Sequence, residues 1–277
     1  RDLRMSRGLG DVYKRQLIHL FDKNTFEHLA SSTYQGQGPG EITIIGHVGI
    51  DETNRRFFVS DHGKLKIFAY DLDSVLTTPE YQPSVKIDMK KKLFPDDYLY
   101  LNDTLCIARI IEPVGNNDYK PSVARWNMAT GEINPMPYEY PDLKKVRFIY
   151  AASAEHQLYV QCYTQYDLMT ICDFNGNLKC NIYGPKWVNE KTQTQHYSLG
   201  VEFCGDKILA LYSGGDHRTD AYYPTKFLVF DLNGNYLKTL ETGYMITDFC
   251  YDKENNRLII NLNDEIQFAY LDLEGII

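Results

Sequence analysis

Long hydrophobic runs are missing from this chain of 277 residues: no stretch holds eighteen consecutive apolar residues, which excludes a transmembrane helix. The six cysteines lack the close paired spacings of a zinc site, and most lie within apolar strand patterns. We therefore expect small buried thiols rather than disulfides. No Gly-x-Ser-x-Gly motif is present, which excludes a serine-nucleophile elbow. The glycine-rich stretch at residues 34–42 lacks the Lys-Ser/Thr pair of a phosphate-binding loop.

Strand-forming aromatic residues are abundant instead, with 22 tyrosines and 13 phenylalanines. Turn signals recur about every ten residues, as an all-β chain requires. The clearest unit is FLVFDLNGNYLKT at residues 227–239, where apolar and polar residues alternate on both sides of Asn233-Gly234. We predict a β-hairpin there, with Asn233 and Gly234 as positive-φ residues of a tight turn.

The same unit recurs along the chain, each time as an apolar strand followed by a polar residue and a turn. The mean spacing of these polar residues is 50 residues. A period of roughly 40 to 50 residues with several short strands is the signature of a propeller blade. The polar residues should accept backbone N–H bonds from their own turns. They are Asp22, Asp71, Asn127, Asp173, Asp231 and Asp272.

The sequence thus predicts an all-β, six-bladed β-propeller that forms a single domain over residues 17–277. The first blade is expected to be truncated at its N-terminal half, since only two strands fit between residues 17 and 32. The last blade is also short of a fourth strand, which suggests closure by a strand from the N-terminal part. The later blades are expected at residues 47–89, 98–141, 147–184, 197–243 and 246–273.

Residues 1–16 differ from the rest, because RDLRMSRGLGDVYKRQ holds five basic and two acidic residues and no strand alternation. DVYKRQ, at residues 11–16, resembles the translation of a transposase adapter used in sequencing libraries. We interpret the segment as non-native; the alternative is a basic N-terminal arm. Removing its net charge of +3 changes the formal charge of the chain from −8 to −11. Nucleic acid is therefore not an expected partner, because a phosphate backbone selects basic surfaces.

Two stretches carry a family resemblance: GQGPGEI at residues 36–42, directly after the DKNTF hairpin, and NRLIINLNDEIQFAYLDLEG at residues 256–275. Together with the blade period, they resemble the TolB-like six-bladed propellers of Gram-negative envelope proteins, many of which are lipoproteins of uncharacterised role. The resemblance implies a periplasmic or outer-membrane-anchored protein. It implies membrane contact only through a lipid anchor upstream of this sequence, and it supplies no catalytic motif. Asn127 departs from the Asp usual at that position of the repeat.

Function in propellers usually resides on the face where the loops between second and third strands meet the connections between blades. Two such loops are long, at residues 112–120 and 213–225, and we expect them to frame one concave mouth with residues 36–41. The second loop mixes ionisable and aromatic side chains, as recognition surfaces do. Arg218 would suit an acidic peptide or a sugar bearing a carboxylate. The candidate binding residues are Gln37, Glu41, Asp61, His62, Tyr119, Asp216, His217, Arg218, Tyr222 and Tyr223.

These features predict a binding protein of the bacterial envelope that recognises a protein or glycan partner and performs no chemistry. The alternative is a Ca²⁺-dependent, lactonase-like hydrolase, with carboxylate and amide oxygens as metal ligands. The spacing of those ligands is not diagnostic, because Asp and Asn at strand ends commonly form turns. If the protein only binds a partner, no cofactor is expected. The ligands of the alternative are Glu41, Asp61, Asn116 and Asp264.

Two details of side-chain placement follow from the alternation. Phe230 shares a face with Leu228 and should pack between neighbouring blades. With Asn175-Gly176 as a two-residue turn, Cys172 should pair with Lys179, which places Cys172 and Cys180 on opposite faces of their sheet.

Overall fold

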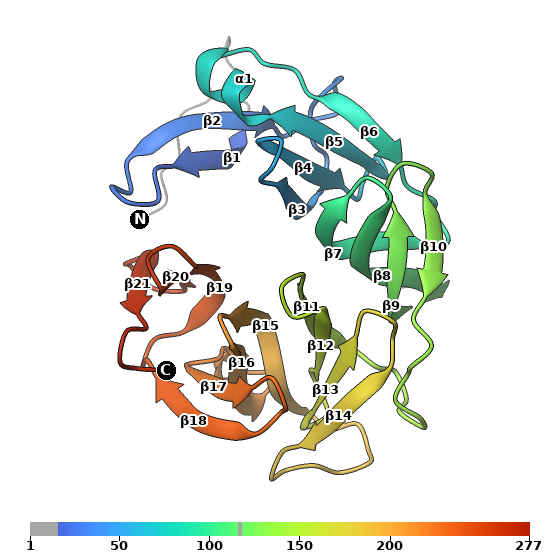
Figure 1. The fold of residues 1–277 in the computed structure, drawn as a ribbon, viewed down its shortest axis with the longest axis vertical. Helices are drawn as coiled ribbons and strands as arrows, with labels where there is room; N and C mark the ends of the chain where they lie inside the picture. Colours follow the sequence, from blue (N-terminus) through green and yellow to red (C-terminus); the bar gives the residue numbers. More distant parts are fainter. Residues whose placement is uncertain (1–15, 116–117) are drawn as a thin grey trace. The chain divides into compact units, whose positions relative to one another are not determined.

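A computed structural model of the chain describes residues 16–115 and 118–277 (Figure 1). In this part of the chain the strands form six antiparallel sheets, which follow one another in sequence order. Within each sheet, strands adjacent in sequence are hydrogen-bonded neighbours. The chain divides after residue 90 into two compact units, and each is described by itself. Of the segment interpreted as non-native, all but Gln16 lies outside the described residues.

The first unit contains a hairpin and a four-stranded sheet. In its core, Phe57 and Tyr70 stack with ring centroids 4.7 Å apart, and Leu20 of the hairpin packs against the same cluster. The helix α1 (Leu72–Thr77) is short, and no helix of the described residues is long and apolar enough to cross a membrane. The strands are β1 (Gln16–Phe21), β2 (His28–Tyr34), β3 (Ile45–Asp51), β4 (Arg56–Asp61), β5 (Lys66–Asp71) and β6 (Ser84–Asp88).

The second unit contains three four-stranded sheets and one three-stranded sheet. A 3-10 helix, η1 (Asp220–Tyr222), lies between the second and third strands of the fifth sheet. The third and fourth sheets are β7 (Phe94–Asn102), β8 (Leu105–Gly115), β9 (Asp118–Asn127), β10 (Glu132–Pro135), β11 (Phe148–Ser153), β12 (Leu158–Tyr163), β13 (Leu168–Asp173) and β14 (Leu178–Tyr183). The fifth and sixth are β15 (Thr194–Cys204), β16 (Lys207–Asp216), β17 (Lys226–Asp231), β18 (Tyr236–Glu241), β19 (Ile246–Asp252), β20 (Arg257–Leu262) and β21 (Phe268–Asp272).

The hairpin predicted at residues 227–239 is β17–β18, but its predicted two-residue turn is wrong. Gly234 has a φ of +85°, whereas Asn233 does not adopt positive φ. The turn spans four residues and is closed by the N–H of Asp231, which donates to the Asn235 carbonyl at 3.0 Å. The Asp231 carboxylate accepts the N–H groups of Asn233 and Asn235 at 2.8 and 2.9 Å, which favours this wider turn.

Five of the six polar residues that mark the repeat accept backbone N–H bonds from the residues that follow them, as predicted, whereas within the described residues no such bond is found for Asp272. Asp22, Asn127, Asp173 and Asp231 each accept two backbone N–H bonds from residues two to four positions later, at 2.8–3.0 Å. Asp71 instead caps α1, where its carboxylate accepts the N–H of Ser74 at 2.7 Å. The recurrent carboxylate is therefore a structural feature of the fold.

Packing between sheets follows the predicted faces. Phe230 is 3% exposed and lies in one cluster with Val160 of the fourth sheet and Ile208 of the fifth, and Leu228 packs against this cluster. All six cysteines are free. Cys172 pairs with Leu178 across a bulge, so the predicted pairing with Lys179 is wrong. Cys180 pairs with Ile171, which still places Cys172 and Cys180 on opposite faces, as predicted.

Candidate functional site

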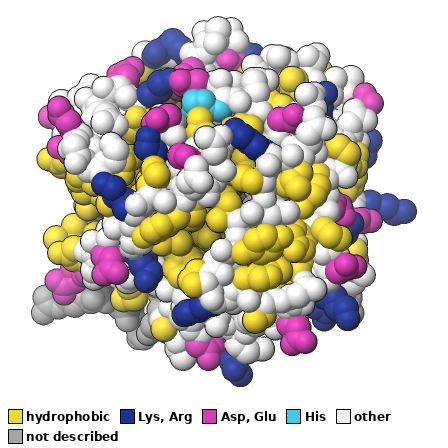
Figure 2. All heavy atoms as spheres, turned by 60° about the horizontal axis from the view of Figure 1, so that its bottom comes forward, with side chains coloured by type: hydrophobic (Ala, Val, Ile, Leu, Met, Phe, Trp, Pro, Cys, Tyr) yellow, Lys and Arg dark blue, Asp and Glu magenta, His cyan; other side chains and the backbone are white. Residues whose placement is uncertain are grey.

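The loops expected to carry function lie at one end of the sheets within the second unit. Neighbouring strands alternate in direction, so the turn between the second and third strand lies at the same end as the connection to the next sheet. Apolar side chains are exposed on this unit: Tyr183, Tyr236 and Tyr270 are each more than half exposed, at 51, 56 and 57%. Figure 2 shows one face on which hydrophobic side chains collect, with charged side chains around them.

Residues 112–115 and 118–120 belong to the paired strands β8 and β9, which corrects the predicted long loop. Glu112 pairs with Lys120, and Pro113 pairs with Tyr119. Arg147 of the β10–β11 connection holds this hairpin: it donates to the Tyr119 carbonyl at 2.8 Å and to Asp118 Oδ1 at 2.5 Å. The guanidinium also lies 3.7 Å from the centroid of the Tyr119 ring. Because of the Arg147 hydrogen bond, the pKa of Asp118 lies below its usual value.

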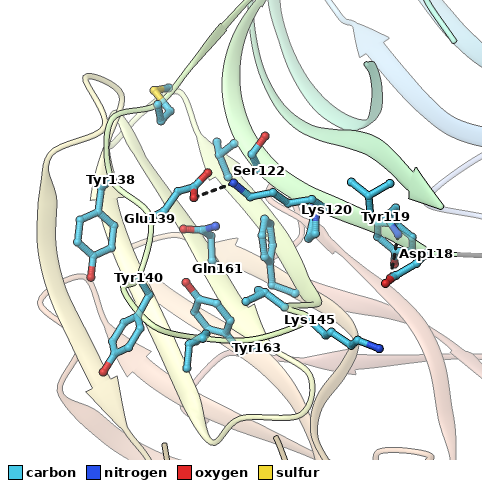
Figure 3. A pocket seen from close by; sticks show the side chains of 17 residues that line it. Asp118, Tyr119, Lys120, Ser122, Tyr138, Glu139, Tyr140, Lys145, Gln161 and Tyr163 are labelled. Atoms are coloured by element: carbon cyan, nitrogen blue, oxygen red, sulfur yellow. Dashed lines mark hydrogen bonds and ion pairs between the residues drawn. The ribbon is translucent and has the colours of Figure 1, made fainter. Parts of the chain in front are cut away.

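A pocket of about 350 Å³ lies between this hairpin, the β10–β11 connection and β12 (Figure 3). Figure 3 shows Tyr138 and Tyr140 on one side, Tyr119 on the other, and Gln161 between them. We call it the tyrosine pocket, after Tyr119, Tyr138, Tyr140 and Tyr163 in its lining. Tyr119 is thus the one residue of the predicted binding set that lines this pocket.

Contacts at their hydroxyl groups hold the rings of Tyr138 and Tyr140 in place. The Tyr138 hydroxyl accepts a hydrogen bond from Asn181 Nδ2 at 2.9 Å, and Asn181 Oδ1 in turn accepts one from Thr170 at 2.7 Å. The hydroxyls of Tyr140 and Tyr183 lie 3.3 Å apart. These contacts from β13 and β14 fix the orientation of the pocket wall before any ligand arrives.

Charged side chains are nearly balanced at the pocket. Lys120 Nζ lies 3.0 Å from Glu139 Oε2, and Asp118 is bound to Arg147. Lys145 also lines the pocket, and no carboxylate of the described residues lies within ion-pair distance of its ammonium group. The charged residues that line the pocket are therefore two cations, Lys120 and Lys145, and two carboxylates, Asp118 and Glu139, in a chain whose net charge is −8.

Gln161 is the polar group that sequence reasoning missed. It lies within β12, a strand whose six residues are all buried, and its side chain is 6% exposed. Gln161 is one of the residues that line the tyrosine pocket. Within the described chain, its Oε1 has no hydrogen-bond partner. A buried acceptor left unpaired costs about 1–3 kcal/mol. A polar residue inside the run LYVQCY was the available signal, because an amide is unfavourable in a buried strand without a partner.

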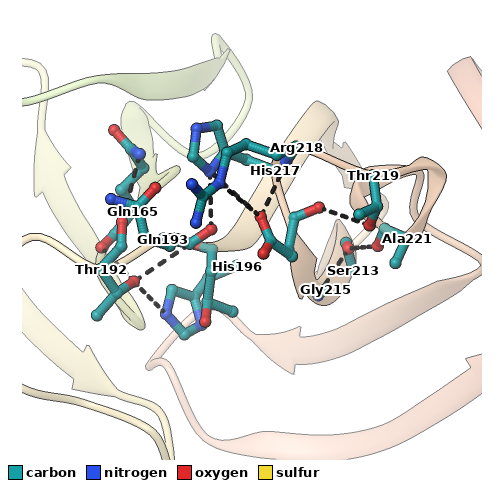
Figure 4. A network of polar contacts seen from close by, with 12 residues as sticks. Gln165, Thr192, Gln193, His196, Ser213, Gly215, His217, Arg218, Thr219 and Ala221 are labelled. Atoms are coloured by element: carbon teal, nitrogen blue, oxygen red, sulfur yellow. Dashed lines mark hydrogen bonds and ion pairs between the residues drawn. The ribbon is translucent and has the colours of Figure 1, made fainter.

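A second polar cluster surrounds Arg218, beyond the end of β16 (Figure 4). Asp216 pairs with Thr194, so the predicted loop at 213–225 is strand at its start and η1 in its middle. His217 Nδ1 lies 2.9 Å from the Gln193 carbonyl. Arg218 donates its N–H to Asp216 Oδ1 at 2.9 Å, and its Nε lies 3.6 Å from the same oxygen. We call residues 216–223 the Arg218 hairpin.

The charged and aromatic groups of the Arg218 hairpin are only partly available. The Arg218 side chain is 67% exposed, but Asp216 offsets part of its charge. The pKa of Asp216 is lowered, first by the Arg218 N–H bond and then by the guanidinium charge. Tyr222 and Tyr223 are half-buried and lie against each other, with ring centroids 4.2 Å apart. The hairpin thus presents one cation beside an aromatic pair.

A buried polar group supports this end of the fifth sheet. His196 Nδ1 lies 3.2 Å from the Tyr212 hydroxyl and 3.7 Å from Asp167 Oδ1, and His196 and Asp167 are each 1% exposed. Burial lowers the pKa of His196, and the Asp167 charge opposes this shift only in part. A neutral His196 then links the fourth sheet to the fifth.

The remaining predicted binding residues belong to the first unit. In the first unit, Asp61 is fully buried and accepts five hydrogen bonds, at 2.8–3.1 Å. Burial raises the pKa of Asp61, but the backbone N–H bonds together shift it below its usual value. Glu41 Oε2 accepts the Gly38 N–H at 2.7 Å inside its own glycine loop. Gln37 is exposed there, and His62 is half-buried.

The Ca²⁺ alternative has no assembled site in what the structure describes. No group of three or more His, Cys, Asp or Glu side chains there could hold a metal ion. Asp264 is exposed in the second unit and accepts the N–H of Glu265 at 2.6 Å. Asn116 lies outside the described residues.

Comparison with known proteins supports the fold. A protein-family model described as a 6-bladed beta-propeller matches residues 9–103, which is less than half of the chain. No curated protein matches the sequence. A crystal structure of a member of the DUF4221 family from Bacteroides vulgatus is similar with a TM-score of 0.61 and 12% identity, covering 92% of this chain and 86% of that one.

Two further solved structures are similar. A protein of unknown function from Bacteroides caccae has a TM-score of 0.53 and 13% identity, covering 94% of this chain and 88% of that one. The extracellular domain of a proposed hybrid two component system from B. thetaiotaomicron has a TM-score of 0.54 and 11% identity, covering 92% of this chain but 30% of that longer chain. The predicted all-β, six-bladed propeller fold is thereby confirmed.

Proposed function

We propose that this protein is a binding propeller of the cell envelope that recognises a protein or glycan partner and performs no chemistry itself. The observation that carries the proposal is the tyrosine pocket: a concave site with aromatic walls and a few polar groups that converge on it. Ligand sites generally have this composition. The Arg218 hairpin, at the same end of the second unit, offers a further charged and aromatic contact.

Preorganisation supports recognition over a purely structural role for the pocket. Tyrosine offers a large contact area with few rotatable bonds, and it is enriched among residues that dominate binding energies. Here the hydroxyls of Tyr138 and Tyr140 are already engaged by residues of β14, so little side-chain entropy remains to be lost on binding.

An envelope location is supported by two similarities. One structural neighbour is an extracellular domain, and the sequence resembles TolB-like envelope propellers in two stretches. The lactonase-like alternative has no comparable support. Asp61, one of its four expected ligands, already accepts five hydrogen bonds within the protein, so a metal would have to displace them.

The test is capture of a partner from the envelope extract of a Bacteroides species, the genus of the structural neighbours. We compare the wild type with two double variants: Tyr138→Ala with Tyr140→Ala, and Arg218→Ala with Tyr222→Ala. Tyr236→Ala serves as the control, because Tyr236 is an exposed tyrosine outside the pocket whose hydroxyl bonds locally to Thr239. Protease or periodate treatment of the captured material identifies it as protein or glycan.

We expect the wild type and Tyr236→Ala to retain the same partner and the Tyr138–Tyr140 variant to lose it. The Arg218–Tyr222 variant should bind more weakly. Recovery of the same material by all four proteins, each with an unchanged melting temperature, would contradict the proposal. Turnover of a lactone by the wild type without any captured partner would contradict it as well.

A further inference from the structure

Gln161, which lines the tyrosine pocket and has an unpaired acceptor, points to the kind of ligand that the pocket takes. We infer that the tyrosine pocket binds one pyranose ring that carries a carboxylate, a uronic acid unit of a glycan, with a ring hydroxyl donating to Gln161 Oε1. The inference rests on the proposed function and narrows it to a ligand class.

Gln161 supplies the buried polar group of the pocket. Gln161 is one of the residues that line the pocket, and its buried Oε1 finds no partner among the described residues. A ligand that brings a hydrogen-bond donor to this side chain would complete the unpaired acceptor. A site built around a buried polar group also rejects analogues that lack the matching donor, because the acceptor then stays unpaired. A sugar hydroxyl is such a donor.

The walls of the pocket are aromatic. The rings of Tyr138, Tyr140 and Tyr163 line the same pocket as Gln161, and the first two are fixed by contacts to β14. The face of an aromatic ring is electron-rich, so it attracts the slightly positive C–H groups on one face of a pyranose. The pocket of about 350 Å³ is at the small end of the range of ligand sites, which suits one or two sugar rings.

Lys145 favours a ligand that carries a carboxylate. Lys145 is exposed at the pocket and is the cation there for which the described chain provides no carboxylate within ion-pair distance. Lys120 and Arg147 are paired with Glu139 and Asp118. A ligand carboxylate near Lys145 would give its ammonium group an ion-pair partner, whereas a neutral sugar would not.

The experiment uses the full chain and a panel of small probes, with binding followed by saturation-transfer NMR and isothermal titration. The sugar probes are the methyl glycosides of glucuronic and galacturonic acid, together with those of glucose and galactose. The peptide probes are N-acetyl-tyrosine amide and N-acetyl-glutamate amide, which represent a protein partner. Single sugars bind weakly, so we expect dissociation constants on the order of millimolar.

At least one uronide should bind about fivefold or more tightly than its neutral counterpart, and Lys145→Gln should abolish that preference. Gln161→Leu should weaken uronide binding about tenfold or more. The same change should leave the melting temperature equal or raise it by a few degrees, because it removes an unpaired buried acceptor. A merely structural Gln161 would not produce loss of binding together with retained or increased stability.

Gln161→Met is the second variant, in case the branched leucine does not fit β12. Gln267→Leu is the matched control, because Gln267 is an exposed residue between β20 and β21, outside the pocket. Absence of binding by all four glycosides, binding by the peptide probes alone, or uronide binding that is unchanged in both Gln161 variants would overturn the inference. Equal binding of uronides and neutral glycosides would show that the pocket does not recognise a carboxylate on the sugar.

These outcomes separate the two proposals. If no glycoside binds but capture of the envelope partner still depends on Tyr138 and Tyr140, the proposed function stands and the pocket takes another ligand. If capture is also independent of the tyrosines, both proposals fail.

Discussion

Asp61 and Gln161 occupy comparable places, since each is a buried polar residue on the second strand of a four-stranded sheet, yet their surroundings differ completely. Asp61 accepts five hydrogen bonds from the segments beside it. Gln161 leaves its Oε1 without a partner in the part of the chain that is described, next to a pocket. A saturated buried group contributes to stability, whereas an unsaturated one lowers stability and is retained for another reason.

Buried carboxyl groups with and without hydrogen-bond donors also differ in the direction of their pKa shifts. Glu202 of β15 is surrounded by acidic side chains rather than donors: burial raises its pKa to about 8, and the charges of Asp97 and Asp248 add to the shift. The pKa of Asp61 is shifted in the opposite direction. Burial alone therefore does not decide the charge state of a carboxyl group in this fold; the supply of hydrogen-bond donors does.

The largest effect is expected at the saturated site. Asp61→Ala should lower the free energy of unfolding by about 3–5 kcal/mol, because it leaves several buried N–H groups near Thr43 and Lys64 unpaired at once. Urea denaturation followed by circular dichroism measures the change. Asp61→Asn is the control for shape, and it should cost less because it keeps part of the acceptor capacity. A loss below about 1 kcal/mol for Asp61→Ala would mean that water replaces the carboxylate, and the contrast with Gln161 would disappear.

Glu202 should produce an intermediate effect that depends on pH. Its folded-state pKa of about 8 lies above the usual 4.5, so the folded protein binds the extra proton between these values. Its contribution to stability is fully present below about pH 4.5 and is lost as the pH rises through about 8. Glu202→Gln should therefore be more stable than the wild type at pH 8 to 9, by about 1–3 kcal/mol, and the difference should shrink toward pH 5.

Denaturant titrations of both proteins at pH 5, 7 and 9 measure this dependence. Glu241→Gln serves as the control, because Glu241 is an exposed carboxyl group at the end of β18. Parallel stability curves for wild type and Glu202→Gln over this range would show that Glu202 is solvated and charged in the folded state.

The contrast also explains what the sequence could predict. The period of 50 residues and the Asx turns at Asp22, Asp173 and Asp231 are local signals, and they located the six sheets. The wider turn after Asp231 depends on Asn235 as well as on Asn233 and Gly234, so the dipeptide alone predicted the wrong loop length.

The tyrosine pocket was only partly predictable, because distant residues assemble it. Tyr119 was found from loop chemistry, but its loop is a strand hairpin that Arg147 holds from 28 residues away. Tyr138 and Tyr140 lie in a proline-containing connection with no strand pattern. Tyr163 lies in an apolar strand, where the sequence predicts a buried core residue. Only Gln161 carried a local signal, as a polar residue in a buried strand.

The smallest effect is expected where a carboxylate accepts several hydrogen bonds but remains in water. Asp231 accepts two backbone N–H bonds and one from the Asn235 amide, at 2.8–2.9 Å, in an exposed turn. Asp231→Ala should cost about 1 kcal/mol, because the released N–H groups can bond to water. Phe230→Ala, one residue earlier, should cost about 3–5 kcal/mol, because it opens a cavity between the fourth and fifth sheets. Urea denaturation of the two variants side by side is the measurement. If Asp231→Ala matched the loss expected for Asp61→Ala, the number of hydrogen bonds rather than their burial would determine the stability that a carboxylate contributes.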